Sequence, residues 1–116
     1  MADERRAHPR LRVYYPVRLY PAHSMRVVET LTKDLAVGGF RSLSATVLPV
    51  ASELRVELVL PQGREPIMAK GRAVWFRSIP ESEQFDVGIV FSGLSETDKR
   101  RLSVCLQDSQ ANPALV

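Results

Sequence analysis

Four arginines lie close together near the start of the sequence, before the first regular hydrophobic pattern: Arg5, Arg6, Arg10 and Arg12. Pro9 has no backbone N–H and disfavours helix in the residue before it, so we expect an extended or looped segment. The arginine guanidinium is a planar set of donors that matches phosphate oxygens and the O6/N7 edge of guanine. The cluster therefore indicates either a binding arm for an anionic nucleotide or an ordinary solvated basic tail.

A second candidate is the segment Asp34-Leu35-Ala36-Val37-Gly38-Gly39, which separates two β-strand patterns. Paired glycines allow positive φ angles and let a backbone approach a ligand closely. The Asp34 carboxylate could accept hydrogen bonds from the N–H donors on the Watson–Crick edge of guanine. Taken alone, the segment is more typical of a β-turn whose aspartate caps its own backbone.

Residues that could support catalysis are few. The histidines, His8 and His23, have no plausible nucleophile near them in sequence, and Cys105 falls on the apolar side of a predicted helix. The chain has no paired-carboxylate or metal-ligand spacing. We therefore expect a binding protein with no catalytic residue, no metal and no cofactor.

The elements that must position these residues are mainly β-strands. Period-2 hydrophobic patterns bounded by Pro, Gly and Ser predict strands over residues 13–20, 25–35, 40–43, 52–60, 67–77 and 85–91. Pro16, inside the first of them, indicates a sheet edge or a bulge. Trp75 shares the strand parity of Ala69 and Ala73, which favours a place in the core. An exposed indole there would instead be a possible secondary contact that stacks on a base.

One helix is predicted over residues 94–108. Ser95-Glu96-Thr97-Asp98 resembles a capping box, and the following apolar residues share one face, opposite a run of cations. The apolar residues are Leu102, Cys105 and Leu106, and the cations expected in water are Lys99, Arg100 and Arg101. The sequence therefore predicts an all-β fold, a six-stranded antiparallel β-barrel with one C-terminal α-helix covering it.

Length and composition fit this interpretation. The 116 residues suit one domain, with a flexible arginine-rich arm over 1–12, a barrel over 13–92, the helix, and a frayed tail over 109–116. The net charge of +3 is too small for a protein that coats DNA. The chain contains no run of eighteen apolar residues, no signal-peptide core and a single cysteine. We therefore expect a soluble, cytoplasmic protein with no membrane partner.

Together, the arginine segment and the glycine turn resemble the signature of the PilZ domain family. In that family an Arg-x-x-x-Arg arm, matched by Arg6 and Arg10, precedes the first strand. An (Asp/Asn)-x-(Ser/Ala)-x-x-Gly turn follows the second strand, and Asp34, Ala36 and Gly39 match it. Residues 71–75 and 85–91 resemble later strands of the family, so the resemblance covers nearly the whole chain.

The resemblance implies a bacterial receptor for the second messenger cyclic di-GMP (c-di-GMP). Arg6 and Arg10 would contact phosphate and guanine, while Asp34 and the turn at Gly38 and Gly39 would hold a guanine edge. Signalling would then pass to a downstream protein, which the sequence does not identify.

Two further residues bear on how the ligand would bind. Arg5 directly precedes the arm motif, and in relatives an arginine there accompanies two intercalated ligand molecules rather than one. Ala36 stands where many relatives have serine. The missing hydroxyl hydrogen bond would cost about 1 kcal/mol without abolishing binding.

Two other interpretations stay open. Small basic barrels often bind single-stranded nucleic acid, but they use aromatic platforms interleaved with Lys and Arg along the strands. Here the most regular aromatics, Phe85 and Phe91, lie on an apolar stripe, so we expect no nucleic-acid partner. The fold could also serve an adaptor that acts through partners without ligand, although the intact motif residues argue against it.

Overall fold

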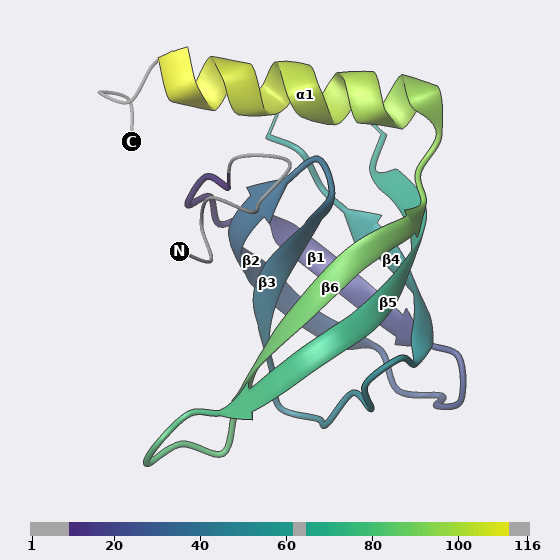
Figure 1. Cartoon of the computed structure of the whole chain (residues 1–116), viewed down its shortest axis with the longest axis vertical. Coiled ribbons are helices and arrows are strands. Elements are labelled where there is room, and N and C mark those ends of the chain that lie inside the picture. Colours follow the sequence, from purple (N-terminus) through teal and green to yellow (C-terminus); the bar gives the residue numbers. More distant parts are fainter. Residues whose placement is uncertain (1–9, 62–64, 112–116) are drawn as a thin grey trace.

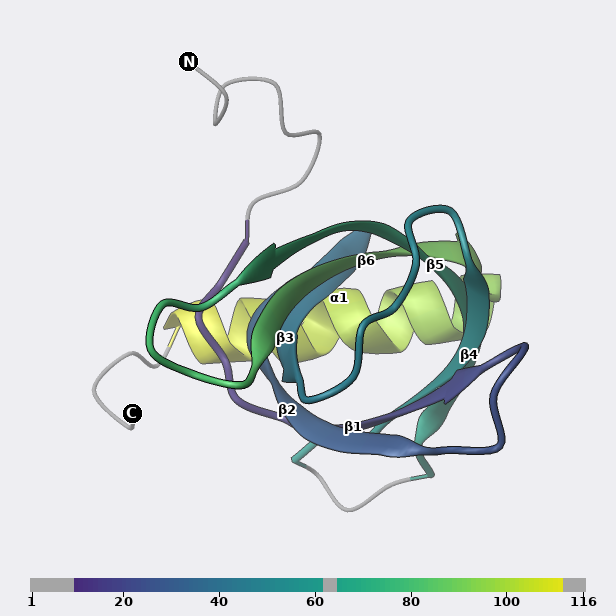
Figure 2. The same cartoon turned by 90° about the horizontal axis from the view of Figure 1, so that it is seen from below.

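Six β-strands form a closed antiparallel barrel in the computed structural model, which describes residues 10–61 and 65–111. The elements are β1 (Pro16–Pro21), β2 (Val28–Ala36), β3 (Gly39–Ser44), β4 (Glu53–Leu58), β5 (Ile67–Ser78), β6 (Phe85–Gly93) and α1 (Glu96–Ala111). The strand order around the barrel is β1-β2-β3-β6-β5-β4, and α1 lies across one end (Figure 1). Figure 2 shows the same barrel from below, with α1 behind the ring of strands. The predicted fold class is confirmed.

Alternation along the strands fills the barrel. On β6, Val87 and Ile89 are buried, and Phe85 and Phe91 pack against the core, as the apolar stripe predicts. Phe40 on β3 is among the largest fully buried side chains. The apolar face of α1 closes this core with Leu102, Cys105 and Leu106. Burying this stripe offsets the entropic cost of ordering the helix.

The helix begins at its predicted cap and ends later than predicted. The Ser95 hydroxyl accepts a hydrogen bond from the Asp98 N–H at 3.1 Å, which satisfies one free donor of the first turn. The Asp98 carboxylate pairs with Arg101 at 3.1 Å. Arg101 also donates to the carbonyl of Glu65, so this cation is partly buried against the barrel rather than fully in water. The helix continues to Ala111, three residues beyond the predicted end.

The expectation that Pro16 marks a sheet edge or a bulge is wrong. Pro16 marks neither an edge nor a bulge: β1 pairs with both β2 and β4, and the Pro16 carbonyl accepts from the Val59 N–H at 2.9 Å. Proline is tolerated there because it is the first residue of the strand. The bulges lie elsewhere: between Thr32 and Asp34 on β2, between Ala73 and Trp75 on β5, and between Phe91 and Gly93 on β6.

No helix in the described ranges is long and apolar enough to cross a membrane.

Candidate functional site

The base of the predicted arm is joined to β2. The Leu11 N–H donates to the Leu35 carbonyl at 3.0 Å, and the Leu35 N–H donates to the Leu11 carbonyl at 2.9 Å. This bridge brings Arg10 beside Asp34, with Nη1 of Arg10 3.9 Å from Oδ1 of Asp34. Two predicted site residues are thus neighbours in space. Arg5 and Arg6 lie outside the described residues.

The Asp34 side chain is nearly buried and only partly satisfied. Its Oδ2 lies 3.1 Å from Nε of Arg41, and the side chain is 13% exposed. The two atoms form an ion pair whose angles do not make a hydrogen bond, and Oδ1 accepts none from the described residues. A buried carboxylate oxygen without a donor is unfavourable. Oδ1 of Asp34 is therefore a buried acceptor whose hydrogen bond is not made within the described part of the chain.

The glycine turn after Asp34 is held against β6. The Gly38 carbonyl accepts from the Phe91 N–H at 2.9 Å. A Cβ on Gly39 would lie 2.2 Å from the carbonyl oxygen of Ile89, so glycine is needed there for close approach of the two strands. Ala36, at the end of β2, is buried. These contacts hold the turn that follows Asp34 in place against β6.

Trp75 lies at the opposite end of a row of residues that begins at Asp34. The strand register aligns Asp34 with Arg41, Arg41 with Gly88, and Gly88 with Trp75, in one row across β2, β3, β6 and β5. The indole covers Gly88, where a Cβ would lie 2.3 Å from its Nε1. The favoured core placement of Trp75 is wrong because the β5 bulge between Ala73 and Trp75 reverses the strand's parity and turns the partly buried indole outward.

A second row on the same outer face centres on a residue that the sequence analysis missed. Asp86 on β6 is 3% exposed, and its carboxylate lies 2.8 Å from Nζ of Lys33 and 3.1 Å from Nη2 of Arg77. Burial acts to raise the pKa of Asp86, but the hydrogen bonds from Lys33 and Arg77 hold it below its ordinary value. Alternation alone predicts an exposed residue here, and the sequence carries no motif for this ion pairing.

The two rows give the outer face a net positive charge and one flat aromatic surface. Four cations, Arg10, Lys33, Arg41 and Arg77, surround two carboxylates, Asp34 and Asp86. Guanidinium and ammonium groups are able to bind phosphate, a carboxylate oxygen is able to accept hydrogen bonds from N–H groups of a base, and an indole is able to stack on a purine. We name this surface the Asp34–Trp75 face, after the two ends of its first row.

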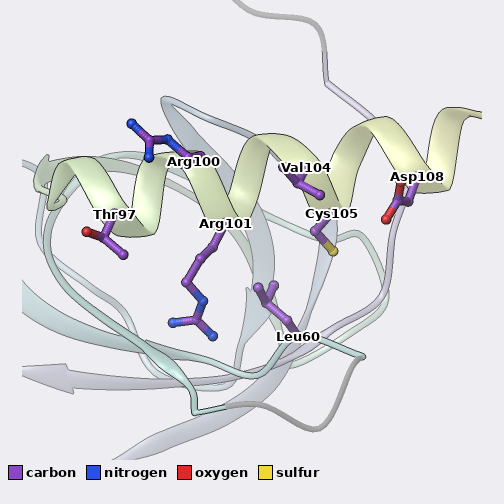
Figure 3. A pocket seen from close by; sticks show the side chains of 7 residues that line it. All are labelled: Leu60, Thr97, Arg100, Arg101, Val104, Cys105 and Asp108. Atoms are coloured by element: carbon purple, nitrogen blue, oxygen red, sulfur yellow. The ribbon is translucent and has the colours of Figure 1, made fainter.

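A separate pocket of about 380 Å³ lies between α1 and the barrel (Figure 3). It is lined by Leu60, Thr97, Arg100, Arg101, Val104, Cys105 and Asp108. None of these residues belongs to the Asp34–Trp75 face. No group of three or more His, Cys, Asp or Glu in the described part of the chain could hold a metal ion.

Close to this pocket, the hydroxyl of Tyr15 links the segment after the arm to α1. The Tyr15 oxygen lies 3.4 Å from Sγ of Cys105 and 3.0 Å from Oγ of Ser109. The backbone of Tyr15 is fixed to Thr32 by two hydrogen bonds, of 2.9 and 3.0 Å. Burial, and next the Cys105 contact, raise the pKa of Tyr15, so the phenol stays protonated.

Comparison with known proteins adds a family and a fold. Residues 4–108 match the family model described as the PilZ domain. The PilZ domain of YcgR from Escherichia coli, solved with c-di-GMP, is 16% identical with a TM-score of 0.73, over 96% of this chain and 97% of that one. The Bacillus subtilis inhibitor of motility (MotI/DgrA) is 19% identical with a TM-score of 0.78, over 92% of this chain and 52% of that one.

A structure of YcgR from Escherichia coli in complex with c-di-GMP is 16% identical with a TM-score of 0.79, over 95% of this chain and 48% of that one. The chain thus spans about half the length of that protein and of the motility inhibitor. At these identities the likeness shows a shared fold. No curated protein sequence matches the chain.

Proposed function

This chain belongs to the PilZ domain family, and we propose that it is a receptor for cyclic di-GMP. The similar structures of YcgR contain c-di-GMP, and MrkH, another similar structure, is described as a c-di-GMP-dependent transcription regulatory factor. These are properties of those proteins. Our proposal for this chain depends on its own Asp34–Trp75 face.

The observation that carries the proposal is the free Oδ1 of Asp34, buried beside Arg10. Guanine offers two N–H groups on its Watson–Crick edge, which is the donor set that this oxygen lacks. Arg6 and Arg10 would bind phosphate and guanine, and Trp75 would stack on a base. The glycine turn at Gly38 and Gly39 would let the ligand approach the backbone.

We propose that residues 1–12 act as the ligand-binding arm, and that Arg5 supports a pair of intercalated ligands. Each c-di-GMP carries two phosphates. A single molecule therefore balances the net charge of +2 on the described face, and a second would need the two further arginines at Arg5 and Arg6. The receptor would signal by contact with a downstream protein rather than by catalysis.

Calorimetric titration with c-di-GMP tests the proposal and gives the stoichiometry. We expect Arg6→Ala and Arg10→Ala each to weaken binding at least about tenfold, because each removes a charge-assisted contact. Their thermal midpoints should stay near that of the wild type. Arg26→Ala is the matched control, since Arg26 is an exposed arginine outside the Asp34–Trp75 face.

A parallel titration with single-stranded oligonucleotides at two salt concentrations tests the nucleic-acid alternative. Binding of oligonucleotide with a steep salt dependence, and no response to c-di-GMP, would overturn the proposed function. Equal c-di-GMP affinity in the wild type and in both arm variants would show that the ligand binds elsewhere. In the expected result, c-di-GMP binds and the oligonucleotide does not.

A further inference from the structure

Asp86 is an unusual residue for the outside of a barrel strand. Outward-facing carboxylates are normally exposed to water, whereas this side chain is 4% exposed. It is covered by groups from two other strands, Lys33 of β2 and Arg77 of β5. Removing a carboxylate from water is costly unless cations and hydrogen bonds compensate. The arrangement therefore fixes two cations at defined places on the surface.

Those places border the proposed ligand site. Asp86 is two residues from Gly88 along β6, so the second row lies about 7 Å from the row that joins Asp34 to Trp75. Lys33 directly precedes Asp34 at the β2 bulge and reaches over β3 to Asp86 on β6. Both cations keep donors for a ligand, because the Lys33 side chain is 31% exposed and that of Arg77 is 69% exposed.

We infer that Lys33 and Arg77 form a second phosphate-binding pair, and that Asp86 is the positioning residue that holds them there. This inference rests on the proposed function and extends it to groups outside the two sequence motifs. The arm would bind one phosphodiester of the ligand, and this pair would bind the other. An ammonium and a guanidinium held by one carboxylate retain free N–H groups for phosphate oxygens.

Two possible roles of Asp86 predict opposite changes in affinity. If Asp86 merely competes with the ligand for the cations, its removal makes the face more positive and binding becomes tighter. If it positions Lys33 and Arg77, its removal frees two long side chains, and the ligand must then order them at an entropic cost. Binding then becomes weaker despite the gain in positive charge.

The experiment compares c-di-GMP affinities of Lys33→Met, Arg77→Met, the double variant with both changes, Asp86→Asn and the triple variant by calorimetry, with thermal midpoints measured in parallel. We expect Lys33→Met and Arg77→Met each to weaken binding about fivefold to tenfold, and Asp86→Asn about fivefold. In the triple variant the loss should match that of the two cation changes alone, because Asp86 acts through them. Lys70→Met and Arg26→Met, exposed cations outside both rows, are the matched controls.

Each outcome decides between the roles. Tighter or unchanged binding by Asp86→Asn would overturn the positioning role, and wild-type affinity in both cation variants would overturn the phosphate pair. An additional loss from Asp86→Asn in the triple variant would show a general structural effect and would also overturn it. Should Asp86→Asn fail to fold, Lys33→Met and Arg77→Met still decide whether the two cations bind the ligand. If the wild-type protein itself shows no binding, the proposed function fails, and the phosphate pair fails with it.

Discussion

Replacing Asp34 by asparagine changes one oxygen of a nearly buried side chain into an amide nitrogen at almost constant volume. In the proposed complex the carboxylate accepts N–H donors from guanine, and a hydrogen bond to a charged group contributes about 1.5–3 kcal/mol. The amide keeps one acceptor, loses the charge and presents its own donors to the base. We therefore expect Asp34→Asn to cost about 3 kcal/mol of binding, which is about 100-fold in Kd.

The same substitution should hardly change the stability of the free protein. It weakens the ion pair with Arg41, a partly exposed contact that contributes about 1 kcal/mol or less. It also removes a buried carboxylate oxygen that has no donor, which is unfavourable by about 1–3 kcal/mol. Because the two effects oppose each other, the thermal midpoint should stay within about 5 °C of the wild type.

Calorimetric titration with c-di-GMP at one fixed salt concentration measures the affinity, and circular dichroism measures the midpoint. Glu29→Gln is the matched control, since it makes the same chemical change on the same strand, at an exposed carboxylate paired with Arg18 at 3.1 Å. We expect the control to bind like the wild type. An affinity of Asp34→Asn within about threefold of the wild type would refute the role of Oδ1. So would a loss of binding accompanied by a large fall in the midpoint, since unfolding would then explain it.

Three further predictions concern the scaffold. Gly39→Ala should destabilise the fold by about 2 kcal/mol or more, because the new Cβ meets the backbone of Ile89; urea unfolding should show a lower midpoint at an unchanged slope. Tyr15→Phe removes the hydrogen bond with Ser109, so it should lower the stability by about 1 kcal/mol. Amide hydrogen exchange in the C-terminal half of α1 should become faster, and unchanged exchange there would contradict this. The pKa of Asp86 is lowered in the folded state, so its contribution to stability is present above its unfolded-state pKa and is lost as the pH falls through the folded value. In Asp86→Asn the free energy of unfolding should therefore fall less steeply as the pH is lowered.

Most of the fold could be predicted from the sequence because every strand of a small barrel buries alternate residues. The stripe from Phe85 to Phe91 and the helical face at Leu102 and Cys105 follow directly from this geometry. The helix cap at Ser95 was also predictable, since the cap depends on neighbouring residues alone. The end of α1 was not, because polar residues near a C-terminus carry little signal for where a helix stops.

The candidate site could be predicted only in the parts that local motifs mark. Asp34 and Gly39 lie close together in sequence on either side of one tight turn, but the outward orientation of Trp75 depends on how β5 is paired with β6. A bulge adds one residue to one strand of a pair, so its position depends on how the two strands are paired. The hydrophobic pattern of either strand alone does not show where it lies. Arg41 and Asp86 were missed for a related reason: their partners come from other strands, and only the barrel register brings them together.

The hydroxyl of Tyr15 connects the two ends of the described chain, since it reaches α1 while its backbone pairs with the strand that carries Asp34. A partner that draws α1 away from the barrel must break this contact. By thermodynamic linkage, the loss of the contact changes the stability of the strand beside the proposed ligand site. Coupling of this kind is reciprocal. If the ligand changes the affinity for the partner by some factor, the partner changes the affinity for the ligand by the same factor. A downstream protein that binds α1 would therefore shift the Kd for c-di-GMP, and the size of that shift would measure the coupling between the two binding events.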